Sequence, residues 1–245
     1  ELAARLAAEG KTIKFIYTIS NFHNPMGTTM SLSRRQELLR IAARHSAFVL
    51  DDDAYGEIHF GEAPPPALSA LAGGYGVITV GTFSKIIATG LRVGWVHARP
   101  EIIEVVARMR FDMGNSAMLH HTLAEYIDGG RLDDHLEEMR LLYAEKMDIL
   151  ASALTEFAEP YLTFTRPKGG FFLWLKLQKG LTAEAVQRAA VQEGVIFPIG
   201  RAFFPEQKES DGEHIRLAYS WTSKDDLREG AERLARACAR AAEGE

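Results

Sequence analysis

The chain has 245 residues, of which 47% are hydrophobic and 25% are charged, an ordinary composition for a globular protein with a sizeable core. Its formal net charge is −5, with no basic stripe, which argues against nucleic acid as the main partner, and no apolar run approaches the length of a membrane span. The single cysteine, Cys238, excludes an internal disulfide framework and fits a reducing cytoplasm.

The first hundred residues alternate between predicted strands and predicted helices. The chain opens at residue 1 inside an amphipathic helix that ends at Gly10, so we expect it to be incomplete at its N-terminus. A further helix, capped by Ser31 or Ser33, precedes the second strand, and residues 61–74 form a Pro/Gly-rich surface loop. The predicted strands cover residues 14–20, 47–50, 77–84 and 91–98. The strands 47–50 and 77–80 look covered on both faces, which favours an α/β fold with a mostly parallel sheet.

The second half of the chain begins with a long helical pattern, from Pro100 to about Phe157. Strands are then predicted over 161–167, 169–177, 195–200 and 214–221, with one helix over 182–194 and a closing helix capped by Ser223. We therefore expect two domains. Residues 1–130 form part of a large domain, and residues 131–245 form a linking helix and a smaller α+β C-terminal domain.

The stretch GTFSKIIATGLRVGW, residues 81–95, places Lys85 among Thr82, Ser84 and Arg92. A lysine becomes a nucleophile when it loses its proton, which burial beside another cation favours. Hydroxyls, backbone N–H groups and an arginine fork also hold phosphate. The stretch therefore indicates a lysine that forms a Schiff base with pyridoxal phosphate. The alternative is a solvated lysine after a strand, with Arg92 on the surface.

The aspartates of DDDAYGE supply a second element of such a site. A carboxylate opposite a pyridine nitrogen keeps that nitrogen protonated, and we assign this role to Asp52. Tyr55 lies three residues further on, where its phenol can bond the ring hydroxyl. The alternative is that Asp51, Asp52 and Asp53 form a solvated turn.

Two more side chains complete the predicted site. Asn24 can donate its amide to the ring hydroxyl, although Asn-Pro also marks a plain turn. Arg216 can bind a substrate carboxylate with its two-pronged fork, although a surface arginine at a strand edge is the alternative. Asn24, Asp52 and Lys85 each follow a predicted strand, and ligands of parallel sheets bind at the carboxyl ends of strands.

The motifs NFHNPMG, DDDAYGE, GTFSKIIATGLRVGW, PKGGFFLWLKL and HIRLAYSW occur in one order over nearly the whole chain. Together they resemble the class I/II aminotransferases of fold type I, the aspartate aminotransferase superfamily. Within it the chain looks most similar to the aminoadipate, kynurenine and aromatic or branched-chain branch. The resemblance implies the three-layer fold of a pyridoxal-phosphate-dependent transferase, with a partial cofactor-binding domain in residues 1–130.

The resemblance also implies roles for individual residues. Lys85 matches the Schiff-base lysine, Asp52 the partner of the pyridine nitrogen, and Arg216 the carboxylate-binding arginine. The ring-hydroxyl contacts match Tyr55 and Asn24, and the phosphate contacts match Thr82, Ser84 and Arg92. The implied reaction moves an amino group between an amino acid and a 2-oxo acid, in a homodimer. Thr89 departs from the family pattern, which usually has proline there.

The family parts that precede the NP-G motif are not found, among them a phosphate-binding turn and a ring-stacking aromatic residue. We therefore expect a fragment that binds the cofactor weakly or not at all alone. Two alternatives to the aminotransferase remain: the effector domain of a transcription regulator, and another pyridoxal-phosphate reaction such as elimination, racemisation or decarboxylation. No metal site is expected, because there is no HExxH motif and His120 and His121 are adjacent.

Overall fold

The computed structural model describes residues 2–111, 114–206 and 212–244. The chain divides into two compact units. The first unit runs to Asn21 and then from Thr29 to Met139, and the second comprises Phe22–Thr28 and the chain from Arg140 onward. The second unit thus takes a short segment from early in the chain, which local patterns in the sequence do not indicate.

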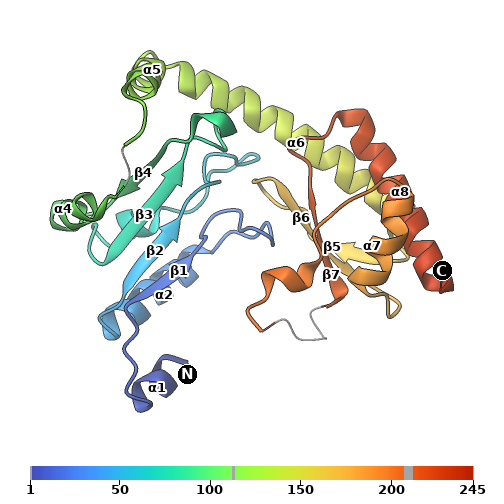
Figure 1. The fold of residues 1–245 in the computed structure, drawn as a ribbon, viewed down its shortest axis with the longest axis horizontal. Coiled ribbons are helices and arrows are strands. Elements are labelled where there is room, and N and C mark those ends of the chain that lie inside the picture. The colour runs from blue at the N-terminus through green and yellow to red at the C-terminus, as the bar shows by residue number, and fades with distance from the viewer. Residues whose placement is uncertain (1, 112–113, 207–211, 245) are drawn as a thin grey trace. The chain divides into compact units, whose positions relative to one another are not determined.

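The first unit contains a four-stranded sheet in the order β1-β2-β3-β4 (Figure 1). Its strands are β1 (Phe15–Thr18), β2 (Phe48–Asp52), β3 (Val77–Thr82) and β4 (Gly94–His97). The first three strands are parallel to one another, and β4 pairs with β3 in the antiparallel direction. The predicted mostly parallel sheet is therefore confirmed.

Helical segments lie before, between and after these strands in the chain. They are α1 (Leu2–Ala8), α2 (Leu32–Arg44), α3 (Leu68–Leu71), η1 (Thr89–Leu91), α4 (Pro100–Met109) and α5 (Ala117–Asp128). The Ser31 side chain accepts a hydrogen bond from the Arg34 backbone and caps α2, as predicted. The short α3 lies within the predicted loop 61–74, so that loop is not wholly irregular.

A small apolar core joins α2 and α3 to one face of the sheet. Ala42, Val49, Leu68 and Val77 are buried together in it. Along β2 the burial alternates, because Val49 and Asp51 are buried whereas Leu50 and Asp52 remain partly exposed. The expectation that both faces of these strands are covered is therefore wrong for the residues that the structure describes, where the opposite face is only partly buried.

The second unit is built on an antiparallel sheet in the order β5-β6-β7 (Figure 1). The strands are β5 (Leu162–Phe164), β6 (Phe172–Leu177) and β7 (His214–Ala218). Its helices are α6 (Arg131–Ala158), which begins in the first unit, α7 (Ala183–Gln192), η2 (Gly200–Phe203) and α8 (Lys224–Glu243). Ser223 caps α8 by accepting from the Asp226 backbone N–H, as predicted.

The predicted strand over residues 195–200 is wrong. One bridge, Ile199 to Ile215, forms there, and η2 begins at Gly200. Pro198 has no N–H to donate to a ladder, so the segment lacks regular pairing although Phe197 within it is buried.

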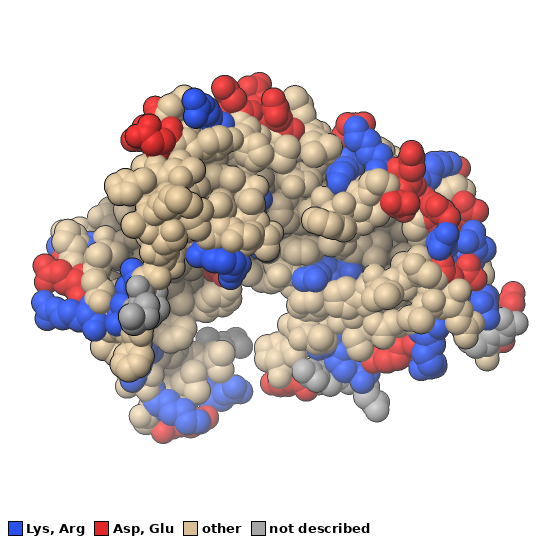
Figure 2. All heavy atoms as spheres, turned by 45° about the horizontal axis from the view of Figure 1, so that its top comes forward, with Lys and Arg blue, Asp and Glu red and all other residues tan. Residues whose placement is uncertain are grey.

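The surface carries charges of both signs, interspersed over the visible face in Figure 2. One cluster joins α7 to α8, where the Glu193 carboxylate accepts from Arg236 and Arg240. Of the helices in the described part of the chain, none combines the length and the apolar character that crossing a membrane requires.

Candidate functional site

The turn between β3 and β4 brings the predicted phosphate ligands into one hydrogen-bonded group. Ser84 donates its backbone N–H to Thr82 Oγ1 over 3.1 Å, and Thr82 Oγ1 donates to the Val93 carbonyl over 3.3 Å. Arg92 Nη1 lies 3.5 Å from Ser84 Oγ and 3.3 Å from the Thr89 carbonyl oxygen. Arg92 has a φ of 54°, an uncommon conformation for a residue with a side chain. Two hydroxyls and a guanidinium therefore meet just after β3.

Lys85 lies in the same turn, three residues after the end of β3. The backbone around it is fixed, because Ile87 and Ala88 both donate to the Phe83 carbonyl. Ile86 beside it is buried. The Lys85 side chain is partly buried, and its amine makes no hydrogen bond or ion pair within the described residues. A lysine amine without such a partner can react as a nucleophile once it loses its proton.

Asp52 ends β2, and its Oδ2 accepts a hydrogen bond from the Tyr17 hydroxyl over 2.7 Å. Partial burial, followed by this bond and the Asp52 charge, raises the pKa of Tyr17 to about 12. The Tyr17 hydroxyl is therefore a donor at neutral pH. Tyr55 is 6% exposed and its carbonyl accepts from the Ile58 backbone, which fixes the turn that follows β2.

The three aspartates do not form a solvated turn. Asp51 is 1% exposed, and burial raises the pKa of its carboxyl group, against the opposing effects of Ser20 and Arg35. Asp53 Oδ1 accepts a hydrogen bond from Asn21 Nδ2 over 2.8 Å. Asp51 is thus buried, whereas Asp52 and Asp53 are partly exposed and each accepts a hydrogen bond from a different side chain.

In the second unit, Asn24 and Arg216 contact each other. Arg216 Nη1 donates to Asn24 Oδ1 over 2.7 Å. The guanidinium also lies 4.3 Å from the ring centre of Phe172 and 4.8 Å from that of Phe203, which are cation–π contacts. Arg216 is therefore not a solvated arginine at a strand edge, because Asn24 and the two phenylalanine rings contact its guanidinium.

The segment that carries Asn24 packs closely on β6. Gly27 has a φ of 66°, and a Cβ there would lie 2.9 Å from the Phe172 carbonyl oxygen and 3.1 Å from Pro167 Cβ. Only glycine meets both conditions without strain. The glycine of the NPMG motif therefore lets the Asn24 turn lie against the strand that also supports Arg216.

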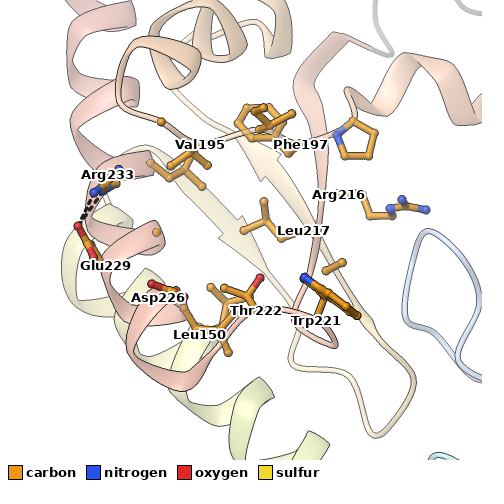
Figure 3. A pocket seen from close by; sticks show the side chains of 17 residues that line it. Leu150, Val195, Phe197, Arg216, Leu217, Trp221, Thr222, Asp226, Glu229 and Arg233 are labelled. Atoms are coloured by element: carbon orange, nitrogen blue, oxygen red, sulfur yellow. Dashed lines mark hydrogen bonds and ion pairs between the residues drawn. The ribbon is translucent and has the colours of Figure 1, made fainter. Parts of the chain in front are cut away.

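A cavity of about 520 Å³ lies beside β7 (Figure 3). Apolar side chains such as Val195, Phe197 and Leu217 line it, together with the ion pair between Arg233 and Glu229. Arg216 contributes to the rim, but in Figure 3 its guanidinium points away from Leu217 and Glu229. We therefore separate this cavity from the predicted site.

The predicted site residues thus form three groups. Thr82, Ser84 and Arg92 meet around the Lys85 turn, Asp52 pairs with Tyr17, and Asn24 pairs with Arg216. Tyr17 was not predicted as a site residue, although the alternation of side chains along β1 and β2 indicates that it lies near Asp52. Tyr17 pairs with Leu50, so its side chain lies on the same sheet face as Asp52, two residues further along β2.

Metal binding has no support in the described residues, where no group of three or more His, Cys, Asp or Glu side chains is arranged to hold an ion. His120 and His121 both lie on α5, and Thr122 beside them donates to the Met118 carbonyl in the same helix. The expectation of no metal site stays a prediction for the whole chain.

Known proteins resemble this chain in sequence and in fold. The model of the family described as aminotransferase class I and II matches residues 1–234. An aromatic-amino-acid aminotransferase of Thermococcus litoralis is 34% identical over 237 residues, which cover 96% of this chain and 56% of that protein. An uncharacterized HTH-type transcriptional regulator of Bacillus subtilis is 33% identical over 219 residues, which cover 89% of this chain and 44% of that protein.

Solved structures agree with the sequence comparison. The α-aminoadipate aminotransferase of Thermus thermophilus, complexed with N-(5'-phosphopyridoxyl)-L-leucine, matches with a TM-score of 0.87 and 34% identity. The match covers 99% of this chain and 63% of that one. The chain spans about half the length of the curated relatives it matches. With a family model that covers residues 1–234 and relatives at this level of identity, the chain belongs to the class I and II aminotransferases.

Proposed function

We propose that the protein is a pyridoxal-phosphate-dependent aminotransferase, which moves an amino group between an amino acid and a 2-oxo acid. The observation that carries the proposal is the Lys85 turn, where an unbonded amine lies beside the hydrogen-bonded group of Thr82, Ser84 and Arg92. Pyridoxal phosphate, when bound, supplies an aldehyde for that amine and a ring that withdraws electrons from the substrate.

The residues fit the chemical groups of this cofactor. Arg92 Nη1 and Ser84 Oγ are 3.5 Å apart, which is long for a hydrogen bond. A phosphate oxygen is a stronger acceptor and can take the place of Ser84 Oγ as the partner of Arg92. Asp52 Oδ2 is held by Tyr17, which leaves Oδ1 to accept from a ring nitrogen. Tyr55 and Asn24 supply a phenol and an amide for the ring hydroxyl. We assign the covalent Schiff-base attachment to Lys85 Nζ.

Catalysis then depends on the actions of Arg216, Lys85 and Asp52. The Arg216 fork holds the carboxylate of the amino acid in a two-point contact, which orients the substrate Cα. Lys85 Nζ takes the Cα proton as a general base and later returns a proton as a general acid. The Asp52 carboxylate would accept from the ring nitrogen of the bound cofactor and so favour the electron-withdrawing form of the ring.

The large-scale organisation follows from these roles. We assign cofactor binding to residues 1–130 and substrate-carboxylate binding to the smaller domain within residues 131–245.

A homodimer is proposed because α4 has no buried residue and exposes Val105 and Met109, at 56% and 77%. A cytoplasmic location is proposed because the one cysteine, Cys238, is free and buried. Analytical ultracentrifugation of the complete gene product tests the dimer.

Covalent labelling tests the cofactor assignment. The complete gene product is mixed with pyridoxal phosphate, its visible absorption band is recorded, and borohydride reduction is followed by peptide mapping. We expect the label on Lys85, no label in Lys85→Ala, and full labelling in Lys11→Ala, a control whose lysine is exposed. A label on any other lysine contradicts the assignment. The same experiment on the isolated 245 residues tests the prediction that they bind the cofactor weakly.

Product analysis tests the reaction class. With an amino acid and 2-oxoglutarate, the proposal predicts glutamate and the matching 2-oxo acid in equal amounts. Ammonia release indicates elimination, and carbon dioxide release indicates decarboxylation. Lys85→Ala should lower the rate by at least about 10²-fold, the typical contribution of general acid–base catalysis.

A second candidate function is the effector domain of a transcription regulator. The similarity to the Bacillus subtilis HTH-type regulator favours it, because the match covers 89% of this chain. In this case the complete gene product binds pyridoxal phosphate at Lys85 but shows no amino transfer, and an amino acid changes its affinity for its own upstream DNA. Turnover without DNA binding rejects this candidate.

A further inference from the structure

Arg35 is a charged side chain that is fully buried in the first unit. It lies on α2 and its exposed fraction is 0%. A buried guanidinium is costly unless its donors are satisfied. Four acceptors surround it: the carbonyl oxygens of Met30, Pro66 and Ser20, and the side-chain oxygen of Asn21. These bonds use four of the five N–H donors and connect Arg35 to three separate segments of the chain.

Two of these acceptors, the carbonyl groups of Ser20 and Met30, belong to the two ends of one loop. Ser20 and Met30 flank the segment Phe22–Thr28, which carries Asn24 and belongs to the second compact unit. Arg35 donates to both stem carbonyls, over 3.3 Å to Ser20 and 2.9 Å to Met30. The Met30 N–H also donates to the Ser20 carbonyl over 2.9 Å. Arg35 therefore closes the base of the loop that presents Asn24.

The second connection leads to the turn after β2. Asn21 accepts from Arg35 through Oδ1, and its Nδ2 donates to Asp53 Oδ1 over 2.8 Å. A Cβ at Gly56 would lie 2.4 Å from that Asp53 oxygen and 3.0 Å from Asn21 Nδ2, so the turn packs tightly on the amide. Asp53 immediately follows Asp52 in the chain. Arg35 thus also fixes, through Asn21, the backbone that carries the predicted ring-nitrogen partner.

We propose that Arg35 is a positioning residue, which sets the Asn24 loop with its guanidinium and the Asp52–Tyr55 turn through Asn21. The inference rests on the proposed function, in which the Asn24 loop and the Asp52–Tyr55 turn both contact the cofactor ring. Lysine cannot replace the arginine, since a single ammonium has three donors and no planar fork that reaches four acceptors in different directions.

The test compares Arg35→Lys with Arg34→Lys in the complete gene product. Arg34 is the exposed neighbour on the same helix, and its backbone N–H donates to Ser31 in both variants. The first measurement is amide hydrogen exchange, which needs no cofactor. We expect exchange of the Met30 amide to rise about tenfold or more in Arg35→Lys, beyond any change in global stability, and to stay unchanged in Arg34→Lys.

The second measurement is the pH midpoint of the visible cofactor band, together with kcat and KM. Arg35→Lys should shift the midpoint and lower kcat about tenfold or more with a smaller change in KM, because its target segments contact the cofactor. Asn21→Ala should shift the midpoint as well but leave Met30 exchange near that of the unmodified protein. Asn21→Ala also carries the test should Arg35→Lys not fold.

The results separate the two proposals. Absence of a cofactor band in the unmodified protein contradicts the proposed function, while Met30 exchange still reports on the closed loop base. A normal band with unchanged exchange and midpoint in Arg35→Lys overturns the positioning role. A loss of activity in proportion to the folded fraction alone, with kcat per folded molecule unchanged, also overturns it.

Discussion

Arg216 and Asn24, 192 positions apart in the sequence, are joined by a hydrogen bond of 2.7 Å from Nη1 to Oδ1. Because a guanidinium only donates, this bond defines which end of the Asn24 amide faces Arg216 and leaves the amide N–H₂ to donate to another group. Phe172 and Phe203 lie against the same guanidinium. One arginine therefore orients the amide, and in the proposed function the same guanidinium binds the substrate carboxylate.

Arg216→Lys tests this double role. An ammonium cannot keep the bond to Asn24 and hold a carboxylate at two points, so we expect KM for the amino acid to rise about 10–100-fold, the range of one or two charge-assisted hydrogen bonds. Steady-state kinetics measures the effect. Arg166→Lys is the control, because that side chain pairs with Asp148 at the surface. An unchanged KM removes Arg216 from carboxylate binding.

Ser84→Ala tests the phosphate group of the proposed cofactor. The hydroxyl lies next to Arg92, and its loss should weaken binding of pyridoxal phosphate about tenfold, the value of a hydrogen bond to a charged group. Pyridoxal, which lacks the phosphate, should bind equally to both proteins. Equilibrium dialysis with both ligands measures the difference. Equal weakening for the two ligands places Ser84 away from the phosphate.

Gly94→Ala and Gly90→Ala form a matched pair in the motif that carries Lys85. A Cβ at Gly94 would lie 2.7 Å from the Gly81 carbonyl oxygen on the neighbouring strand, whereas nothing lies within 4 Å of one at Gly90. Gly94→Ala should lower the free energy of unfolding by about 1–3 kcal/mol, and Gly90→Ala should change it by less than about 0.5 kcal/mol. Urea titration gives both values, and equal effects contradict the close approach of β3 and β4.

Local signals in the sequence predict much of this fold. Ser31 and Ser223 cap helices as predicted, because a cap depends only on neighbours in the chain. Residues 195–200 were predicted as a strand and are not one, because a strand needs a pairing partner that the segment itself does not specify. The antiparallel direction of β4 likewise depends on how the chain returns to β3.

The candidate site also contains residues that local sequence signals predict and residues that they do not. Lys85 and Asp52 are predicted from their chemistry and their place after strands, whereas Tyr17 and Arg35 act through contacts distant in sequence. Arg34 and Arg35 are adjacent and chemically identical, yet only Arg35 is buried. The signal is helical periodicity, because Arg35 precedes Leu38 and Ala42 by three and seven residues and so shares their buried face. Which acceptors meet it there depends on the tertiary fold.

Asp51 makes the stability of the first unit depend on pH. Burial raises the pKa of this carboxyl group, Asp53 adds to the rise, and Ser20 and Arg35 oppose it. A raised folded-state pKa stabilises the protein below the unfolded value, near 3.8, and this stabilisation is lost as the pH rises through the folded value. Between pH 4 and pH 7 the unmodified protein therefore loses stability that an asparagine at this position does not lose.

Asp51→Asn should consequently gain free energy of unfolding relative to the unmodified protein as the pH rises from 4 to 7. Urea titrations of both proteins at the two pH values measure this difference. A relative loss for Asp51→Asn at pH 7 contradicts the prediction, because it means that the attraction to Arg35 outweighs the cost of burying the carboxylate. In that case Asp51 is a partner of Arg35 in the folded protein, and its charge helps to hold the arginine that closes the Asn24 loop.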